Sequence, residues 1–256
     1  MSTIEIIVIA AMEEEVAPFL ERASLVGDPE RVGNATRRTA LINGVGVLLV
    51  QGGIGLVNAA GAATSALLAA NNEPGRTLVP LVISAGSAGG LGAGVRVGDV
   101  VIGTDHINID ADARAFGYVL GQVPGMPASY PVPQSLVQAS VVGAPDHRPG
   151  QTVHQGLIVS SYSFVGPDRA GSITGQFAGV LATDMESAAI AQTCHVHNAA
   201  FLSIRGISDL CGPASDADFL THVDDAAERS AEIATAIFEP LLASMRSGQR
   251  ASRTGV

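Results

Sequence analysis

The chain has 256 residues, of which 47% are hydrophobic and 15% are charged, a composition typical of one large domain with a sizeable core. Its net charge is −10 and its basic residues are scattered arginines without a basic run, which excludes nucleic acid and anionic membranes as expected partners. The sequence contains no lysine, which excludes a Schiff-base lysine, a pyridoxal-phosphate anchor and a lysine-bearing P-loop.

The chain begins with the pattern of a strand, a turn and a helix. Residues 4–10 are a continuous apolar run rich in β-branched residues, and residues 13–23 then show helical spacing. Uniformly apolar segments predict further buried strands at residues 40–51, 78–84, 99–104, 156–160, 180–183 and 201–208. Further helices are predicted at residues 56–70, 186–197 and 222–245. This alternation predicts a mainly parallel sheet flanked by helices, a single α/β sandwich.

The remaining segments set the boundaries of this domain. Residues 116–150 carry six prolines and are expected to form loops across the surface or an interface. One domain is expected over residues 1–246, with a polar, disordered tail over 247–256.

We expect a soluble cytoplasmic protein, because no basic leader region and no apolar run of roughly 20 residues is present. Cys194 and Cys211 lack metal-ligand spacing, so reduced thiols are expected.

Acidic side chains stand at three points where a predicted strand ends. Residues 13–15 follow the first strand, Asp184 and Glu186 follow another, and Asp209 ends a third. Buried carboxylates are costly unless they are paired or used, and ligands of open α/β sheets bind at such strand ends. These acids could instead only cap helices. Only one of the three glutamates can face a crevice, because successive helical side chains point about 100° apart.

Two glycine-rich loops also follow predicted strands. Residues 52–55 resemble half of a dinucleotide fingerprint, but the acid required about 20 residues later is missing, so no nucleotide cofactor is expected. Residues 86–90 allow backbone amides and the Ser87 hydroxyl to approach a ligand, or simply allow tight packing. His195 and His197 point to different helix faces, so no metal site is expected.

Eight short motifs carry a resemblance when they are taken together and in order. They are AMEEEV (11–16), GIG (53–55), GSAGG (86–90), DAD (110–112), FGY (116–118), GQVPG (121–125), ME (185–186) and ISD (207–209). This set resembles the 5′-methylthioadenosine/S-adenosylhomocysteine nucleosidases of the nucleoside phosphorylase superfamily, over about residues 4–237. The resemblance implies a three-layer α/β/α sandwich with a central mixed sheet, a homodimer, no cofactor, and hydrolysis of the N-glycosidic bond to adenine.

By motif position, the resemblance implies roles for three carboxyl groups. Glu15 acts on the attacking water, Asp209 protonates the leaving adenine, and Glu186 binds the ribose hydroxyls. These residue types suit the reaction because loss of adenine creates an oxocarbenium-like sugar, which needs an acid at the leaving group and a base for water. A carboxylate on the ribose also places negative charge near the developing cation.

The resemblance further implies a set of substrate contacts. Phe164 stacks on adenine, the backbone of Val165 reads its edge, and Met185 lies beneath the sugar. The other expected contacts are Met12, Ile54, Ser87, Ala88, Gly89, Arg205 and Ser208. Phe116 and Pro124 either enter this nucleoside site from the neighbouring subunit of the homodimer or only pack the subunit interface.

The sequence departs from the family pattern in two places and is compatible with further functions. Ser161 and Tyr162 stand where the family usually has Gly-Asp, and the segment after Asp209 is short and lacks the usual lid aromatic, which Phe219 could replace. A phosphorylase would need cations around phosphate, and only Arg205 is near. An aminodeoxyfutalosine or futalosine nucleosidase would also fit the pattern, as would a non-catalytic nucleoside-binding protein.

Overall fold

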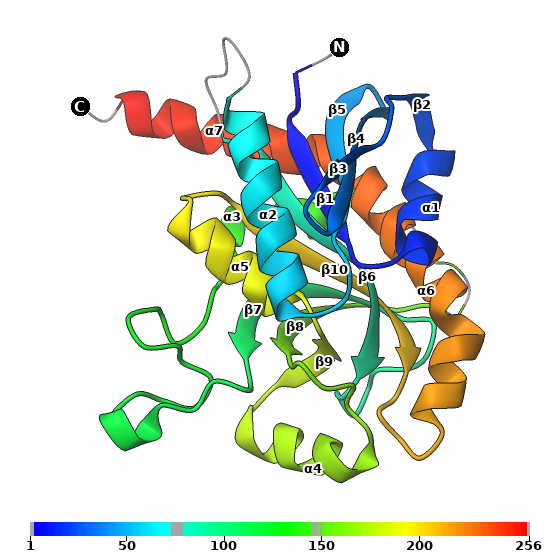
Figure 1. Ribbon diagram of the computed structural model, residues 1–256, viewed down its shortest axis with the longest axis vertical. Coiled ribbons are helices and arrows are strands. Elements are labelled where there is room, and N and C mark those ends of the chain that lie inside the picture. The colour runs from blue at the N-terminus through cyan, green and yellow to red at the C-terminus, as the bar shows by residue number, and fades with distance from the viewer. Residues whose placement is uncertain (1–2, 73–78, 145–147, 149, 255–256) are drawn as a thin grey trace.

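The computed structural model describes residues 3–72, 79–144, 148 and 150–254. Within these residues, ten strands form one mixed sheet with helices on both faces (Figure 1), which confirms the predicted three-layer α/β/α sandwich. Leu78 of a predicted strand lies outside the described residues, as do residues 145–147 and 149 of the predicted loop segment and residues 255–256 of the predicted tail. No helix of the described part is long and apolar enough to cross a membrane.

Three parallel strands form the centre of the sheet, in the order β5 (Val45–Gln51), β1 (Ile6–Ala10) and β6 (Leu81–Gly90). Every residue of β1 and β6 is buried, as expected of strands that are covered on both faces. Alternate residues of β1 belong to two separate hydrophobic clusters. The apolar runs of the sequence therefore serve two cores, one on each face of the sheet.

The two helical layers supply the other half of each core. Residues of α1, α3, α6 and α7 pack into one cluster, and residues of α2 and α5 pack into the other. The alanine-rich faces of α2 and α5 contact one another as well as the sheet. The bounds of these helices are α1 (Glu13–Glu21), α2 (Leu56–Asn71), α3 (Gln134–Gly143), α5 (Ser187–Val196), α6 (Ser215–Ala236) and α7 (Phe238–Thr254).

On one side of β1 the sheet closes on itself. Strand β6 pairs with β9, β9 with β8, β8 with β7, β7 with β10, and β10 again with β6. The bounds of these strands are β7 (Val100–Asn108), β8 (Val153–Ser160), β9 (Val180–Asp184) and β10 (Phe201–Asp209). This closure brings the ends of β6, β9 and β10, where the acidic motifs lie, next to the end of β1.

On the other side of β1 the structure corrects the sequence prediction. The strand predicted over residues 40–51 is wrong, because the chain reverses there between β4 and β5. Asn43 and Gly44 have φ angles of 51° and 80°, and Asn-Gly is the preferred pair for such a two-residue hairpin turn. Strand β4 (Ala35–Ile42) leads into this turn, and β2 (Ala23–Val26) and β3 (Glu30–Val32) pair with β4 at the edge of the sheet. The short strands β2 and β3 were not predicted, because they are mostly exposed and their sequences lack the long apolar run that is typical of a buried strand.

Helical segments also differ from the prediction. The helix predicted over residues 222–245 is two helices, α6 and α7, and Pro240 is tolerated in the first turn of α7, where its missing amide proton has no partner to lose. Helix α3 lies inside the segment predicted to be loops, and α4 (Pro167–Gln176) was not predicted because it buries little. Helix α7 makes residues 247–254 helical, within the segment expected to form a tail.

Candidate active site

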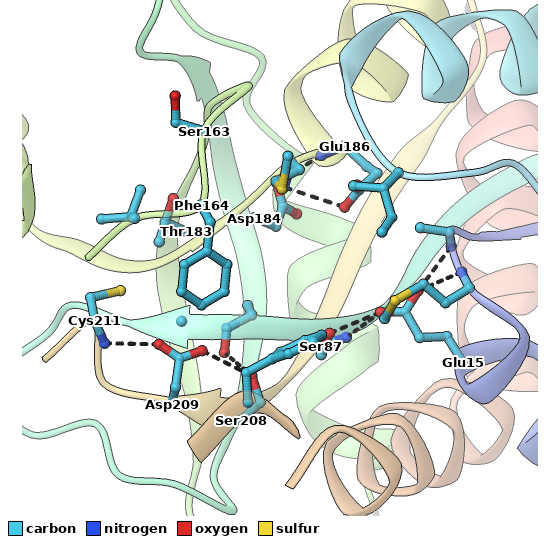
Figure 2. Close-up of a pocket in the computed structure, with 18 residues that line it drawn as sticks. Glu15, Ser87, Ser163, Phe164, Thr183, Asp184, Glu186, Ser208, Asp209 and Cys211 are labelled. Atoms are coloured by element: carbon cyan, nitrogen blue, oxygen red, sulfur yellow. Dashed lines mark hydrogen bonds between the residues drawn. The ribbon is translucent and has the colours of Figure 1, made fainter. Parts of the chain in front are cut away.

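A pocket lies where β1, β6, β9 and β10 end (Figure 2). Strands that end at one edge of a sheet present their following residues to a common crevice. Twelve residues that the sequence predicts for the site line this pocket: Met12, Glu15, Ile54, Ser87, Ala88, Gly89, Phe164, Val165, Met185, Glu186, Ser208 and Asp209.

Glu15 is the acid of the first motif that reaches the pocket. Its side chain is buried, with 2% of its surface exposed, whereas Glu13 and Glu14 are exposed, as the helical register predicts. One carboxylate oxygen accepts hydrogen bonds from the backbone amides of Ala11 (2.9 Å) and Met12 (3.2 Å), the start of its own helix. The other accepts from the Ser87 amide (2.8 Å) and hydroxyl (3.0 Å). Glu15 is therefore both a helix cap and a fixed carboxylate in the pocket.

Gly86 explains how this carboxylate fits against β6. A Cβ atom at residue 86 would lie 2.3 Å from Oε1 of Glu15, and the φ angle of Gly86 is 153°. Real Cβ atoms do not approach a neighbour so closely, so the carboxylate occupies space that every other residue type would fill. Residues 86–90, predicted to form a loop after the strand, are the last part of β6, and the glycine at position 86 is required by Glu15.

Asp209 is placed in the pocket by an irregularity at the end of β10. The register of β10 against β6 shifts between Ile207 and Asp209, and such a bulge re-aims the next side chain. The Cys211 amide (2.9 Å) and the Ser208 hydroxyl (3.1 Å) donate to its carboxylate. Burial raises the pKa of Asp209 above its usual range, and these two hydrogen bonds oppose the rise. The residue is thereby suited to carry a proton.

Glu186 occupies the opposite wall, at the start of α5. Its Oε1 accepts a hydrogen bond from the Gly55 amide at 3.0 Å, and its Oε2 lies 3.7 Å from Nη1 of Arg205. Burial, opposed by the charge of Arg205 and reinforced by repulsion from Asp184 and Glu15, raises the pKa of Glu186 to about 7.

Arg205 and Asp184 form the buried support beneath Glu186. Nε of Arg205 lies 2.8 Å from Oδ2 of Asp184, and both side chains are almost fully buried. Asp184 also accepts hydrogen bonds from the amides of Glu186 and Ser187 at the start of α5. Of the strand-end acids, Asp184 is thus one that caps a helix. Arg205, predicted as a substrate contact, lies beneath the pocket and outside its lining.

The pKa of Glu186 predicts a pH effect on folding. Between about pH 4.5 and pH 7 the folded protein holds a proton on Glu186 that the unfolded chain has lost, so the free energy of unfolding falls as the pH rises. Glu186→Gln is expected to remove this contribution and flatten the decline, measured by chemical denaturation at pH 5 and pH 7.5. Glu14→Gln, at an exposed position, is the control. Equal slopes in the two variants would contradict the buried-acid assignment.

Apolar side chains complete the lining of the pocket. Met12, Ile54, Phe164 and Met185 all contribute, as predicted. Phe219, the candidate for the missing lid aromatic, also lines the pocket, and its ring meets that of Phe164 edge-on at 5.9 Å between centroids. Helix α6 therefore supplies an aromatic that the short segment after Asp209 lacks.

Besides Arg205, two predicted residues lie outside the pocket lining. Phe116 is 82% exposed in 3₁₀ helix η1 (Arg114–Phe116), and Pro124 is exposed in the loop that follows. Neither belongs to the lining formed by this chain. A role for them at the site requires a second subunit.

The glycine-rich loop before α2 does not present a free phosphate cradle. The amides of Gly52 and Gly53 donate to the carbonyls of Ala10 and Ala11, and the Gly55 amide donates to the Glu186 carboxylate. An anion placed there would displace these bonds and face Glu186. Over the described residues, no group of three or more histidine, cysteine, aspartate or glutamate side chains is arranged to hold a metal ion.

Besides Phe219, five lining residues were not among the predicted catalytic residues and substrate contacts: Ala11, Ser163, Thr183, Asp184 and Cys211. Each is adjacent to a predicted residue or two positions from one, so their place in the pocket follows once the strand ends are known. Cys211 has a φ angle of 53°, a conformation that its sequence context does not signal. Adjacency to the motifs was therefore the usable signal.

Comparison with known proteins gives consistent matches over most of the chain. Residues 5–239 match the Phosphorylase superfamily. The 5′-methylthioadenosine/S-adenosylhomocysteine nucleosidase of Anoxybacillus flavithermus is 41% identical over 229 residues, which cover 89% of this chain and 95% of that protein. The nucleosidase of the same name from a Geobacillus species is 37% identical, covering 93% of this chain and 99% of that protein.

A solved structure gives the same result in three dimensions. It is the Neisseria meningitidis 5′-methylthioadenosine/S-adenosylhomocysteine nucleosidase in complex with methylthio-immucillin-A. The two folds agree with a TM-score of 0.84 at 38% sequence identity, over 91% of this chain and 97% of that chain.

Proposed function

The chain belongs to the 5′-methylthioadenosine/S-adenosylhomocysteine nucleosidases of the phosphorylase superfamily, and from this premise we propose how its pocket works. The enzyme hydrolyses the N-glycosidic bond of methylthioadenosine and/or S-adenosylhomocysteine, releasing adenine and the 5-thio-substituted ribose. The observation that carries hydrolysis is the charge of the lining, which includes Glu15, Glu186 and Asp209 and, among the described residues, no arginine or histidine. Phosphorolysis would require cationic groups around a phosphate dianion.

Asp209 supplies the proton for the leaving base. Its raised pKa keeps the carboxyl group protonated to higher pH than that of a free aspartate. As the C–N bond breaks, the electron pair moves to adenine, and the Asp209 proton is transferred to N7 of the base. Neutralising the leaving group in this way lowers the barrier to departure.

Glu15 acts on the water that completes the reaction. Water adds to the oxocarbenium-like carbon of the sugar, and its proton passes to the carboxylate. The Ser87 hydroxyl, which donates to Glu15 in the free site, can rotate and hydrogen-bond the water instead. The three backbone donors keep the carboxylate in place during this exchange.

The remaining groups bind the nucleoside. Glu186 accepts hydrogen bonds from the ribose hydroxyls, and the negative charge of its ionised form favours the developing cation. Phe164 stacks on adenine, the backbone of Val165 reads the base edge, and Met185 lies beneath the sugar. Met12 and Ile54 contact the thioalkyl group.

We propose a cytoplasmic homodimer in which the neighbouring subunit completes the site. Phe116 and Pro124 are exposed in the single chain, and an exposed phenylalanine is suited to pack against another subunit. The catalytic unit is the domain over residues 1–246.

Phosphate independence tests the proposed reaction. Adenine release from methylthioadenosine should proceed at the same rate with and without phosphate, and the sugar product should be the free thio-ribose. Ribose-1-phosphate as product, or a rate that requires phosphate, would contradict hydrolysis. Binding without turnover would indicate a nucleoside-binding protein. A futalosine nucleosidase is a weaker fit to the relatives, and faster cleavage of aminodeoxyfutalosine than of methylthioadenosine would favour it.

A further inference from the structure

Tyr162, one of the two departures from the family pattern, joins two chain segments that both contribute residues to the pocket lining. It lies in the segment 161–165, which follows β8 and carries Phe164. Its hydroxyl oxygen accepts a hydrogen bond from the Val57 amide at 3.0 Å. Val57 lies in the first turn of α2, where backbone amides have no partner within the helix. Tyr162 therefore caps a helix that is distant in sequence.

The ring of Tyr162 also lies over Gly55, the residue whose amide holds Glu186. A Cβ atom at Gly55 would lie 3.3 Å from Cε1 of the ring, and the φ angle of Gly55 is 101°. The same glycine donates to Oε1 of Glu186 at 3.0 Å. The absence of a side chain at residue 55 thus allows the ring to approach the backbone that binds Glu186.

The backbone at Tyr162 is held by contacts that do not involve its hydroxyl. Its amide donates to Oδ2 of Asp110 at 2.6 Å, and the Ser161 hydroxyl donates to Oδ1 at 3.1 Å. Arg169 contacts both Asp110 (3.1 Å) and the Ser161 hydroxyl (2.9 Å). The side chain of Tyr162 is half exposed, so the ring contributes little to the hydrophobic core.

We propose that Tyr162 is a positioning residue that ties segment 161–165 to segment 54–57 and so holds the base-binding and sugar-binding walls at a fixed separation. The expected effect on substrate binding rests on the proposed function. The geometry of the tie is that of the protein without substrate. Asp209 and Glu15 are held by β10, β6 and α1, so Tyr162 acts on binding rather than on the chemical step.

Tyr162→Phe removes the hydroxyl and keeps the ring, and Tyr130→Phe is the matched control at a half-buried tyrosine outside the pocket. Loss of one hydrogen bond should raise KM for methylthioadenosine about three- to tenfold. It should leave kcat within about twofold, because Ile54 and Phe164, which line the pocket on the two tied segments, hold the substrate equally in the ground state and the transition state, and Glu186 keeps its hydrogen bond from Gly55. The Val57 amide of the free enzyme should exchange with deuterium about three- to tenfold faster. Tyr130→Phe should change neither quantity.

The outcomes separate this proposal from the proposed function. An unchanged exchange rate at Val57 in Tyr162→Phe would overturn the tie, whatever the substrate is. Faster exchange with unchanged KM, or a loss confined to kcat, would overturn its positioning role. If the wild-type enzyme does not release adenine from methylthioadenosine, the proposed function fails, and the exchange measurement still decides the tie.

Discussion

Asp209→Asn is expected to lower kcat by about two to four orders of magnitude, the range that general acid catalysis contributes. An amide cannot deliver the proton that the leaving adenine requires. The substitution should leave the site intact, because the asparagine oxygen can accept from the Cys211 amide while its NH₂ donates to the Ser208 hydroxyl. Steady-state kinetics and the affinity for a nucleoside analogue, which should change little, measure the two parts of this prediction.

The pH dependence gives a second measurement on the same variant. Because the pKa of Asp209 is raised and the acid must be protonated, wild-type kcat should fall as the pH rises through that pKa. The variant should lack this limb. Asp28→Asn, at an exposed position between β2 and β3 and outside the pocket lining, is the control and should keep wild-type kinetics. A near wild-type kcat in Asp209→Asn would mean that another group protonates the base.

Glu15→Gln is expected to lower kcat at least about 100-fold, and unlike Asp209→Asn it should also destabilise the protein. The carboxylate accepts from the amides of Ala11 and Met12 on one oxygen and from the Ser87 amide on the other. A glutamine must turn its NH₂ group toward one of these sets of fixed donors. An unsatisfied buried donor should lower the melting temperature by about 2–10 °C, measured by thermal denaturation beside the kinetics.

Glu13→Gln and Glu14→Gln are the matched controls, since both side chains are exposed in the same helical turn. Each should keep kcat within about twofold and leave the melting temperature nearly unchanged, as is usual for exposed surface positions. Comparable losses at Glu13 and Glu15 would show that the cluster acts as a general negative field.

The sequence alone determined the architecture and most of the candidate site, because both depend on local patterns. The fully apolar runs that became β1 and β6 identify buried strands without knowledge of their neighbours. Acids directly after such strands must lie at the sheet edge, which placed Glu15, Glu186 and Asp209 around one pocket. The helical register indicated that only one of the three glutamates could face the crevice, and the family resemblance identified it as Glu15.

Only the tertiary structure decided which groups support these acids, because the supporting contacts join residues that are distant in sequence. Arg205 was predicted to touch substrate, yet its guanidinium is buried against Asp184 beneath the pocket. The capping of α2 by Tyr162 joins residues 105 positions apart. A local pattern reports which side chains are buried or exposed. It does not report which distant backbone donor or charge meets them, since that depends on how the strands close and where each helix begins.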